Sequence, residues 1–106
     1  MAETYFMVGA QVNGGPPAIA AFLNGYNLTP NFETLTITND KNPLSPYNIV
    51  PCGEKGLEEV CLGILVGHTD GNHVVASHPD RLTLAIAEMK EVFGGEDPLI
   101  YVFQEN

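Results

Sequence analysis

Two histidines in the second half of the chain, His68 and His73, have the spacing that points most directly to chemistry. They flank Asp70-Gly71, a preferred pair for the two-residue turn of a β-hairpin. In such a hairpin His68 pairs with His73, and the two imidazoles project from one face with β-carbons about 5 Å apart. They could bind a metal ion that Asp70 or an acid of another chain completes, or act as a proton switch. A solvated hairpin tip is the alternative, and we favour it because the sequence offers no third ligand.

A second candidate is an anion site around His78. Ser77-His78-Pro79-Asp80 has the composition of a helix start, with proline tolerated in the first turn. The free N–H groups of a helix start attract anions, and Arg81 would add a positive charge. A carboxylate or phosphate could bind at His78 and Arg81. An ordinary helix cap with an exposed imidazole ring is the favoured alternative.

Cysteine chemistry is the third possibility. Cys52 lies in Pro51-Cys52-Gly53, and a nucleophilic thiolate there would need a histidine or a helix terminus to lower its pKa. Spacing alone supplies no such partner. Cys61 lies in an apolar run and is predicted to be a small buried core residue. Two cysteines form neither a disulfide framework nor a metal quartet, and no cofactor is predicted.

The stretch 42–56 contains three prolines and two glycines and is predicted to be a long irregular loop, with a short strand at 47–50 as an option. Loops of this kind often carry binding residues. Leu44 and Tyr47 are therefore candidates for contact with a ligand or partner. Leu84 is expected to face solvent on a helix and adds a weaker sign of an interface.

The charge balance excludes some classes of partner. Four basic residues face thirteen acidic ones, for a formal net charge of −9. Such a surface repels nucleic-acid backbones and anionic lipid, so neither is an expected partner. A basic protein would fit, although net charge also serves solubility. The first ten residues include Glu3 and no basic segment, which argues against a signal peptide. No apolar run reaches the roughly 18 residues of a membrane span, so we expect the cytoplasm and reduced thiols.

Periodicity predicts the elements that must position these residues. Strands are predicted at 4–12, 32–38 and 99–103, and a hairpin around Asp70-Gly71. The segment 57–66 fits either a helix or a buried strand, and Gly63 favours the strand. A short helix is expected from Ala18 to a left-handed glycine at Gly25. A second helix after Ser77 carries one apolar stripe and stops at Gly94-Gly95; the stripe consists of Leu82, Ala85, Ile86, Met89, Val92 and Phe93.

The predicted fold is one α+β domain, 1–106, with two helices packed on one mainly antiparallel sheet. A ferredoxin-like sandwich with an extra strand is the leading architecture. The favoured function is a non-enzymatic protein-binding or regulatory module, of the inhibitor or immunity type, for a basic partner. The alternative is a small ligand- or metal-binding protein or hydrolase-type enzyme that uses His68, His73, His78 or Cys52. A homodimer is also expected, because sheet edges and faces of this kind are commonly covered by pairing.

Overall fold

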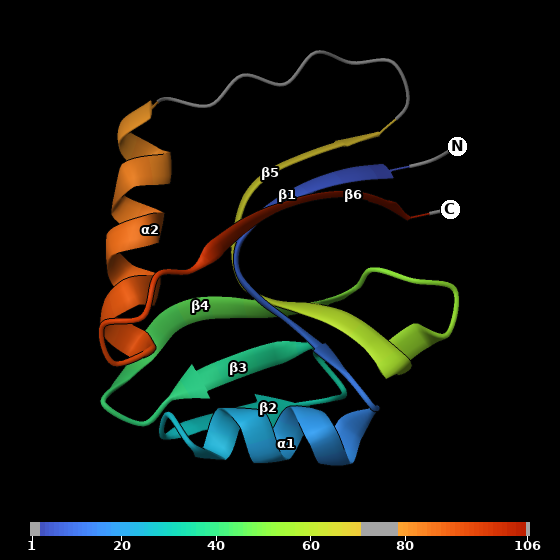
Figure 1. Ribbon diagram of the computed structural model, residues 1–106, viewed down its shortest axis with the longest axis horizontal. Helices are drawn as coiled ribbons and strands as arrows, with labels where there is room; N and C mark the ends of the chain where they lie inside the picture. The colour runs from blue at the N-terminus through green and yellow to red at the C-terminus, as the bar shows by residue number, and fades with distance from the viewer. Residues whose placement is uncertain (1–2, 71–78, 106) are drawn as a thin grey trace.

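The computed structural model describes residues 3–70 and 79–105. These residues form two helices and six strands (Figure 1). The elements follow in chain order: β1 (Glu3–Asn13), α1 (Pro16–Asn24), β2 (Leu28–Asn31), β3 (Thr36–Asn39), β4 (Asn42–Pro51), the 3₁₀ turn η1 (Gly56–Glu58), β5 (Glu59–Asp70), α2 (Pro79–Val92) and β6 (Leu99–Glu105). The predicted α+β class, with two helices on an antiparallel sheet, is confirmed.

The strands form one sheet in the order β2-β3-β4-β5-β1-β6, and every neighbouring pair is antiparallel. The two longest strands, β1 and β5, pair along almost their whole length, from Glu3 opposite Asp70 to Asn13 opposite Glu59. The register shifts once, between Phe6 and Met7. Such a bulge increases the local twist, and the strands curve strongly through this region in Figure 1.

One face of the sheet carries the main core. Alternate residues of β1 and β5, such as Val8 and Leu62, are buried in the same cluster as residues of both helices, Ile19 and Met89 among them. Because side chains alternate across a strand, this places both helices on the same face. Burying large apolar side chains contributes roughly 1.5–3 kcal/mol each. The helices are also joined at one end by ring contacts among Phe22, Tyr26 and Phe93.

The first helix begins with two prolines in its first turn and buries Ile19 and Leu23, as the apolar spacing predicts. The expectation for its end was wrong. Gly25 has a right-handed conformation (φ −63°), and the left-handed conformation falls on Asn27 (φ 60°). Asparagine tolerates this region better than most residues because its side chain can hydrogen-bond locally.

The second helix matches its predicted stripe, since Ala85, Met89 and Phe93 are buried and Leu84 is 70% exposed. It ends at Val92, and Gly94-Gly95 follow with positive φ at both glycines. Their N–H groups donate to the carbonyls of Glu91 and Lys90, which is the usual way to satisfy the last carbonyls of a helix. Within the described part of the chain, neither helix has the length and apolar character that crossing a membrane requires.

The predicted strand at 32–38 was wrong in its first half. Residues 32–35 form a turn between β2 and β3, and only the part from Thr36 onwards is extended. The side-chain oxygen of Asn31 accepts the N–H groups of Glu33 and Thr34 at 3.0 and 3.2 Å, and Leu35 has a φ of 56°. An asparagine side chain that bonds the backbone two residues on favours a turn over a strand.

The predicted irregular loop at 42–56 was also wrong over most of its length, because Asn42–Pro51 is β4, which contains the optional strand at 47–50. Pro51 tolerates the sheet because it lies at the end of the strand. The ambiguous segment 57–66 is η1 followed by β5, as Gly63 favoured. The second arm of the hairpin predicted beyond Asp70-Gly71 lies outside the described residues.

Candidate functional site

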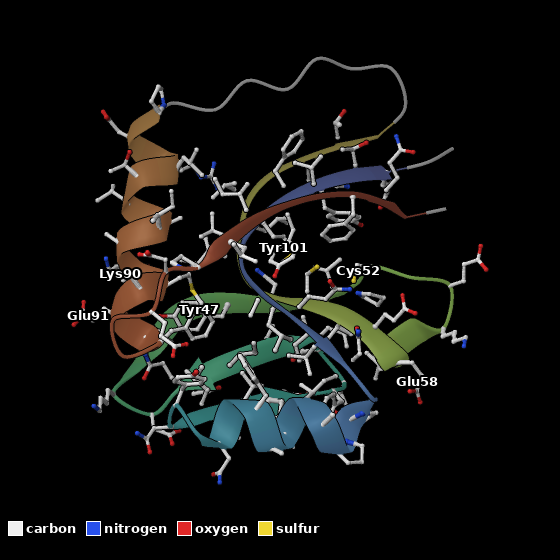
Figure 2. All side chains as sticks on the ribbon, viewed as in Figure 1. Tyr47, Cys52, Glu58, Lys90, Glu91 and Tyr101 are labelled. Atoms are coloured by element: carbon white, nitrogen blue, oxygen red, sulfur yellow. The ribbon has the colours of Figure 1, made fainter. Side chains whose placement is uncertain are left out.

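A hollow lined by side chains of β4 and α2 lies beside Tyr47. It has a volume of about 300 Å³ and is lined by Tyr26, Asn39, Lys41, Tyr47, Glu88, Glu91 and Val92. The Tyr47 hydroxyl donates to Glu88 Oε1 at 2.9 Å, which ties β4 to α2. Figure 2 shows Tyr47 on β4 facing the lower part of α2, where Glu91 also lies. Phenol rings, carboxylates and one lysine therefore surround a space large enough for a small organic molecule.

Tyr47 is consequently in a different setting from the one predicted. It lies in a strand and is 2% exposed, so it forms the base of the hollow and not the tip of a loop. Leu44 belongs to the same strand, and its side chain lies outside what the structure describes. The structure does not bring Tyr47 together with Cys52, although the prediction placed both in one loop. A contact of Leu44 or Tyr47 with a ligand or partner remains a prediction.

His68 lies in a cluster on the opposite face of the sheet. Tyr5 pairs with His68 on β5 and with Phe103 on β6. The Tyr5 ring stacks on both, with centroid distances of 4.8 and 5.5 Å. Glu3 accepts a 2.5 Å hydrogen bond from the Tyr5 hydroxyl and lies 3.5 Å from His68 Nε2. The hydrogen bond from Tyr5 is the main cause that lowers the pKa of Glu3, and His68 adds to it.

The cluster around His68 does not test the predicted metal site at His68 and His73. His73 lies outside the described residues, so the pairing of His68 with His73 is untested. Across residues 3–70 and 79–105, no three His, Cys, Asp or Glu side chains gather closely enough to hold a metal ion. His68 here contacts a carboxylate and an aromatic ring. The two-histidine site remains a prediction, and the sequence analysis missed the contacts of His68 with Glu3 and Tyr5.

The anion site predicted at the start of α2 is described in part. Arg81 is exposed on the first turns of the helix, and His78 lies outside the described residues. Asp80 occupies the first turn, where a carboxylate interacts favourably with the free N–H groups and competes with an external anion. An anion held by His78 and Arg81 remains a prediction.

The two cysteines are neighbours, although they are nine positions apart in the sequence. Cys61 is 2% exposed and Cys52 is partly buried. Burial is the main cause that raises the pKa of the Cys61 thiol to about 12, and its hydrogen bond with Cys52 adds to it. The sequence analysis identified each cysteine separately and missed their contact, which depends on the pairing of β4 with β5. Cys61 is buried as predicted.

The last strand is the most exposed apolar part of the described chain. Leu99, Ile100 and Val102 of β6 are 62%, 52% and 60% exposed. β6 lies at the end of the sheet and pairs only with β1 among the described strands. The sequence predicted the strand but not its place at the edge, which follows from the pairing order.

In comparisons with known proteins, no family model matches the chain, and no curated protein or solved structure matches it significantly.

Proposed function

We propose that this chain is a protein-binding module that takes up an extended, basic segment of a partner protein along the outer edge of β6. The observation that carries the proposal is the exposure of Leu99, Ile100 and Val102 on a strand that has one neighbour among the described strands. An unpaired edge presents N–H and C=O groups to which another chain can add a strand. Apolar side chains beside that edge would add specificity through pockets for alternate residues.

The other end of the sheet differs in a way that supports this choice. β2 has only four residues and contains Pro30, which has no N–H to donate. Short length and proline are two common means of protecting an edge from unwanted pairing. β6 has seven residues, Leu99–Glu105, with neither proline nor lysine among them. The edge that lacks protection is the one proposed to bind.

Charge complementarity points to a basic partner and away from a second copy. Glu96 and Asp97 precede β6, Glu105 ends it, and the whole chain carries a formal net charge of −9. A second copy would bring the same charge to the interface, and like charges facing each other disfavour association. Lysine or arginine residues on either side of an extended segment would meet the acids at both ends of β6.

The test uses a fluorescent synthetic peptide of alternating valine and threonine with lysines at both ends, and a second peptide with glutamates in their place. We expect anisotropy to detect the lysine peptide only, with an affinity that falls as salt is added. Ile100→Glu and Val102→Glu should weaken binding at least tenfold, which is about 1.4 kcal/mol. Leu84→Glu is the matched control, because Leu84 is also an exposed apolar residue but lies on α2.

Two results would contradict the proposal. If the glutamate peptide binds as well as the lysine peptide, or if Leu84→Glu weakens binding as much as the β6 variants, the edge and its acids do not carry recognition. Sedimentation of the chain without peptide tests the other occupant. A stable dimer that Val102→Glu dissociates would show that a second copy covers β6, as the homodimer prediction has it.

The hollow beside Tyr47 favours a second candidate function, the binding of a small organic cation. Its volume of about 300 Å³ is at the lower end of the range for small-molecule sites. Two tyrosine rings and two carboxylates among its lining residues are chemically suited to an ammonium group. Choline serves as the probe, and its binding is measured by the NMR shifts of residues around the hollow. Glu91→Gln should weaken binding, the exposed Glu96→Gln should not, and equal shifts throughout the chain would refute the site.

We also propose that the fold is a ferredoxin-like sandwich in which β1, α1, β4, β5, α2 and β6 are the common elements and β2 and β3 are additions. The neighbour order β4-β5-β1-β6 and the two helix crossovers support it. A reducing compartment such as the cytoplasm remains the proposed location, where both cysteines would be thiols.

A further inference from the structure

The two thiols of this chain meet on the face of the sheet that the helices leave open. Val50 pairs with Cys61, and the N–H of Cys52 donates to the carbonyl of Glu59 at 2.9 Å, which continues the β4–β5 pairing beyond Pro51. Cys52 is therefore a diagonal neighbour of Cys61 on the same face. Both cysteines also line the same cavity.

A small cavity of about 130 Å³ lies beside the thiols and is lined by Gln11, Cys52, Cys61, Tyr101, Val102 and Phe103. The Gln11 side chain approaches Cys52, with Nε2 3.7 Å from Sγ. The backbone N–H of Gln11 donates to the Tyr101 hydroxyl at 3.1 Å, which positions the ring. Figure 2 shows Cys52, which follows the end of β4, and Tyr101 of β6 in the same region of the molecule. Both cysteines thus border a space that a small ion can enter.

We propose that Cys52 and Cys61 bind one soft monovalent metal ion of the Cu(I) class. Thiolate ligands select soft ions, whereas magnesium and calcium require oxygen ligands. Among the described residues no third His, Cys, Asp or Glu joins this pair in a group that could hold a metal ion. A two-ligand site suits Cu(I), which is stable with two thiolates, better than zinc, which takes four ligands. The net charge of −9 attracts cations in general.

The binding of Cu(I) by the two cysteines involves no change of oxidation state. One Cu(I) ion forms bonds to both sulfurs, and the two thiols release two protons to solvent. This differs from disulfide formation, which needs an oxidant to take two electrons. Diagonal neighbours in an antiparallel pair have Cα atoms about 7–8 Å apart, which is at or beyond the limit for a disulfide without backbone movement. An ion between the sulfurs spans that separation with less rearrangement.

The test is an anaerobic titration of the full, reduced chain with Cu(I) in competition with a coloured Cu(I) chelator. We expect one equivalent to bind, with a sulfur-to-copper absorption band in the ultraviolet. Cys52→Ala and Cys61→Ala should each weaken binding at least a hundredfold. Cys52 is only partly buried, so its alanine variant should retain the circular dichroism of the parent chain. The Cys52 variant therefore keeps the test valid if the Cys61 variant does not fold.

His68→Ala is the matched control, since His68 is a potential copper ligand on the same open face, where it contacts Glu3 and Tyr5. Its Cu(I) affinity should equal that of the parent. Binding that survives Cys52→Ala would overturn the proposal. Binding that His68→Ala abolishes would also overturn it and would place the copper at the histidine. Failure of the reduced parent chain to compete with the chelator would overturn it as well. None of these outcomes depends on peptide binding at β6.

Discussion

Gly9 of β1 and Gly63 of β5 lie directly opposite each other at the centre of the sheet. A β-carbon on Gly9 would overlap the carbonyl oxygen of Leu62, and one on Gly63 would overlap that of Val8. Gly63 also has a φ of 145°, which side chains rarely adopt. The two longest strands therefore approach each other closely only because neither residue has a side chain at this point.

Replacing Gly9 by alanine should destabilise the chain by about 3 kcal/mol or more, because the new methyl group meets backbone that cannot rotate away. Urea unfolding followed by circular dichroism measures the loss. Gly25→Ala is the control: Gly25 has a φ of −63° and space for a β-carbon, so its stability should be unchanged or raised by up to about 1 kcal/mol. Equal stabilities of the two variants would show that β1 and β5 separate readily here.

The hydrogen bond between Tyr47 and Glu88 gives a second prediction. Tyr47→Phe removes the hydroxyl that donates to Glu88 Oε1 but keeps the buried ring. Since the bond is partly buried and its acceptor is a carboxylate, its loss should lower the free energy of unfolding by about 1–2 kcal/mol. Glu88→Gln retains an acceptor oxygen and should cost less. If Glu88→Gln costs more than Tyr47→Phe, the carboxylate charge matters beyond this bond.

Glu3 gives a prediction about pH. Its folded pKa is lowered, chiefly by the hydrogen bond from Tyr5, so folding favours the charged carboxylate. The resulting stabilisation is complete above the ordinary glutamate pKa and is lost as pH falls through the lowered folded value. NMR titration of the Glu3 side chain should show that Tyr5→Phe raises this pKa toward its ordinary value.

The control for this titration is Phe103→Leu, which removes the ring stacked on Tyr5 but leaves the hydroxyl in place. The pKa of Glu3 should then change little. A rise as large as that in Tyr5→Phe would mean that the ring stack, and not the hydroxyl bond itself, holds the carboxylate in its charged form.

The sequence predicted those elements whose local pattern and tertiary setting agree. The stripe of α2 and its two final glycines define a helix without reference to the rest of the chain, and the apolar runs at 4–12 and 99–103 define strands in the same way. The segment around 32–38 failed because the Asn31 side chain stabilises a turn where residue alternation favours a strand. The sequence analysis missed β4 because its prolines predict a loop, and its pairing with neighbouring strands cannot be read from the local sequence.

The candidate sites were less predictable, because they depend on which strands pair and in which register. The Cys52–Cys61 contact requires Val50 opposite Cys61, and a shift of one residue would send one thiol to the other face. The exposure of Ile100 and Val102 requires β6 to be at the sheet edge. Neither is encoded in the local pattern of apolar residues.

The three aromatic rings that join the helices give the last prediction. Phe93 is 6% exposed, and its ring centroid lies 5.1 Å from that of Tyr26 and 6.0 Å from that of Phe22. Phe93→Ala should lower the free energy of unfolding by about 3–5 kcal/mol, because it opens a cavity where α1, α2 and the sheet meet. Leu84→Ala is the control and should change it by less than about 0.5 kcal/mol, since Leu84 is exposed on the same helix. A double-mutant cycle of Phe93→Leu with Tyr26→Leu should give a coupling of about 0.5–1.5 kcal/mol, and a coupling near zero would mean that the two rings stabilise the fold independently.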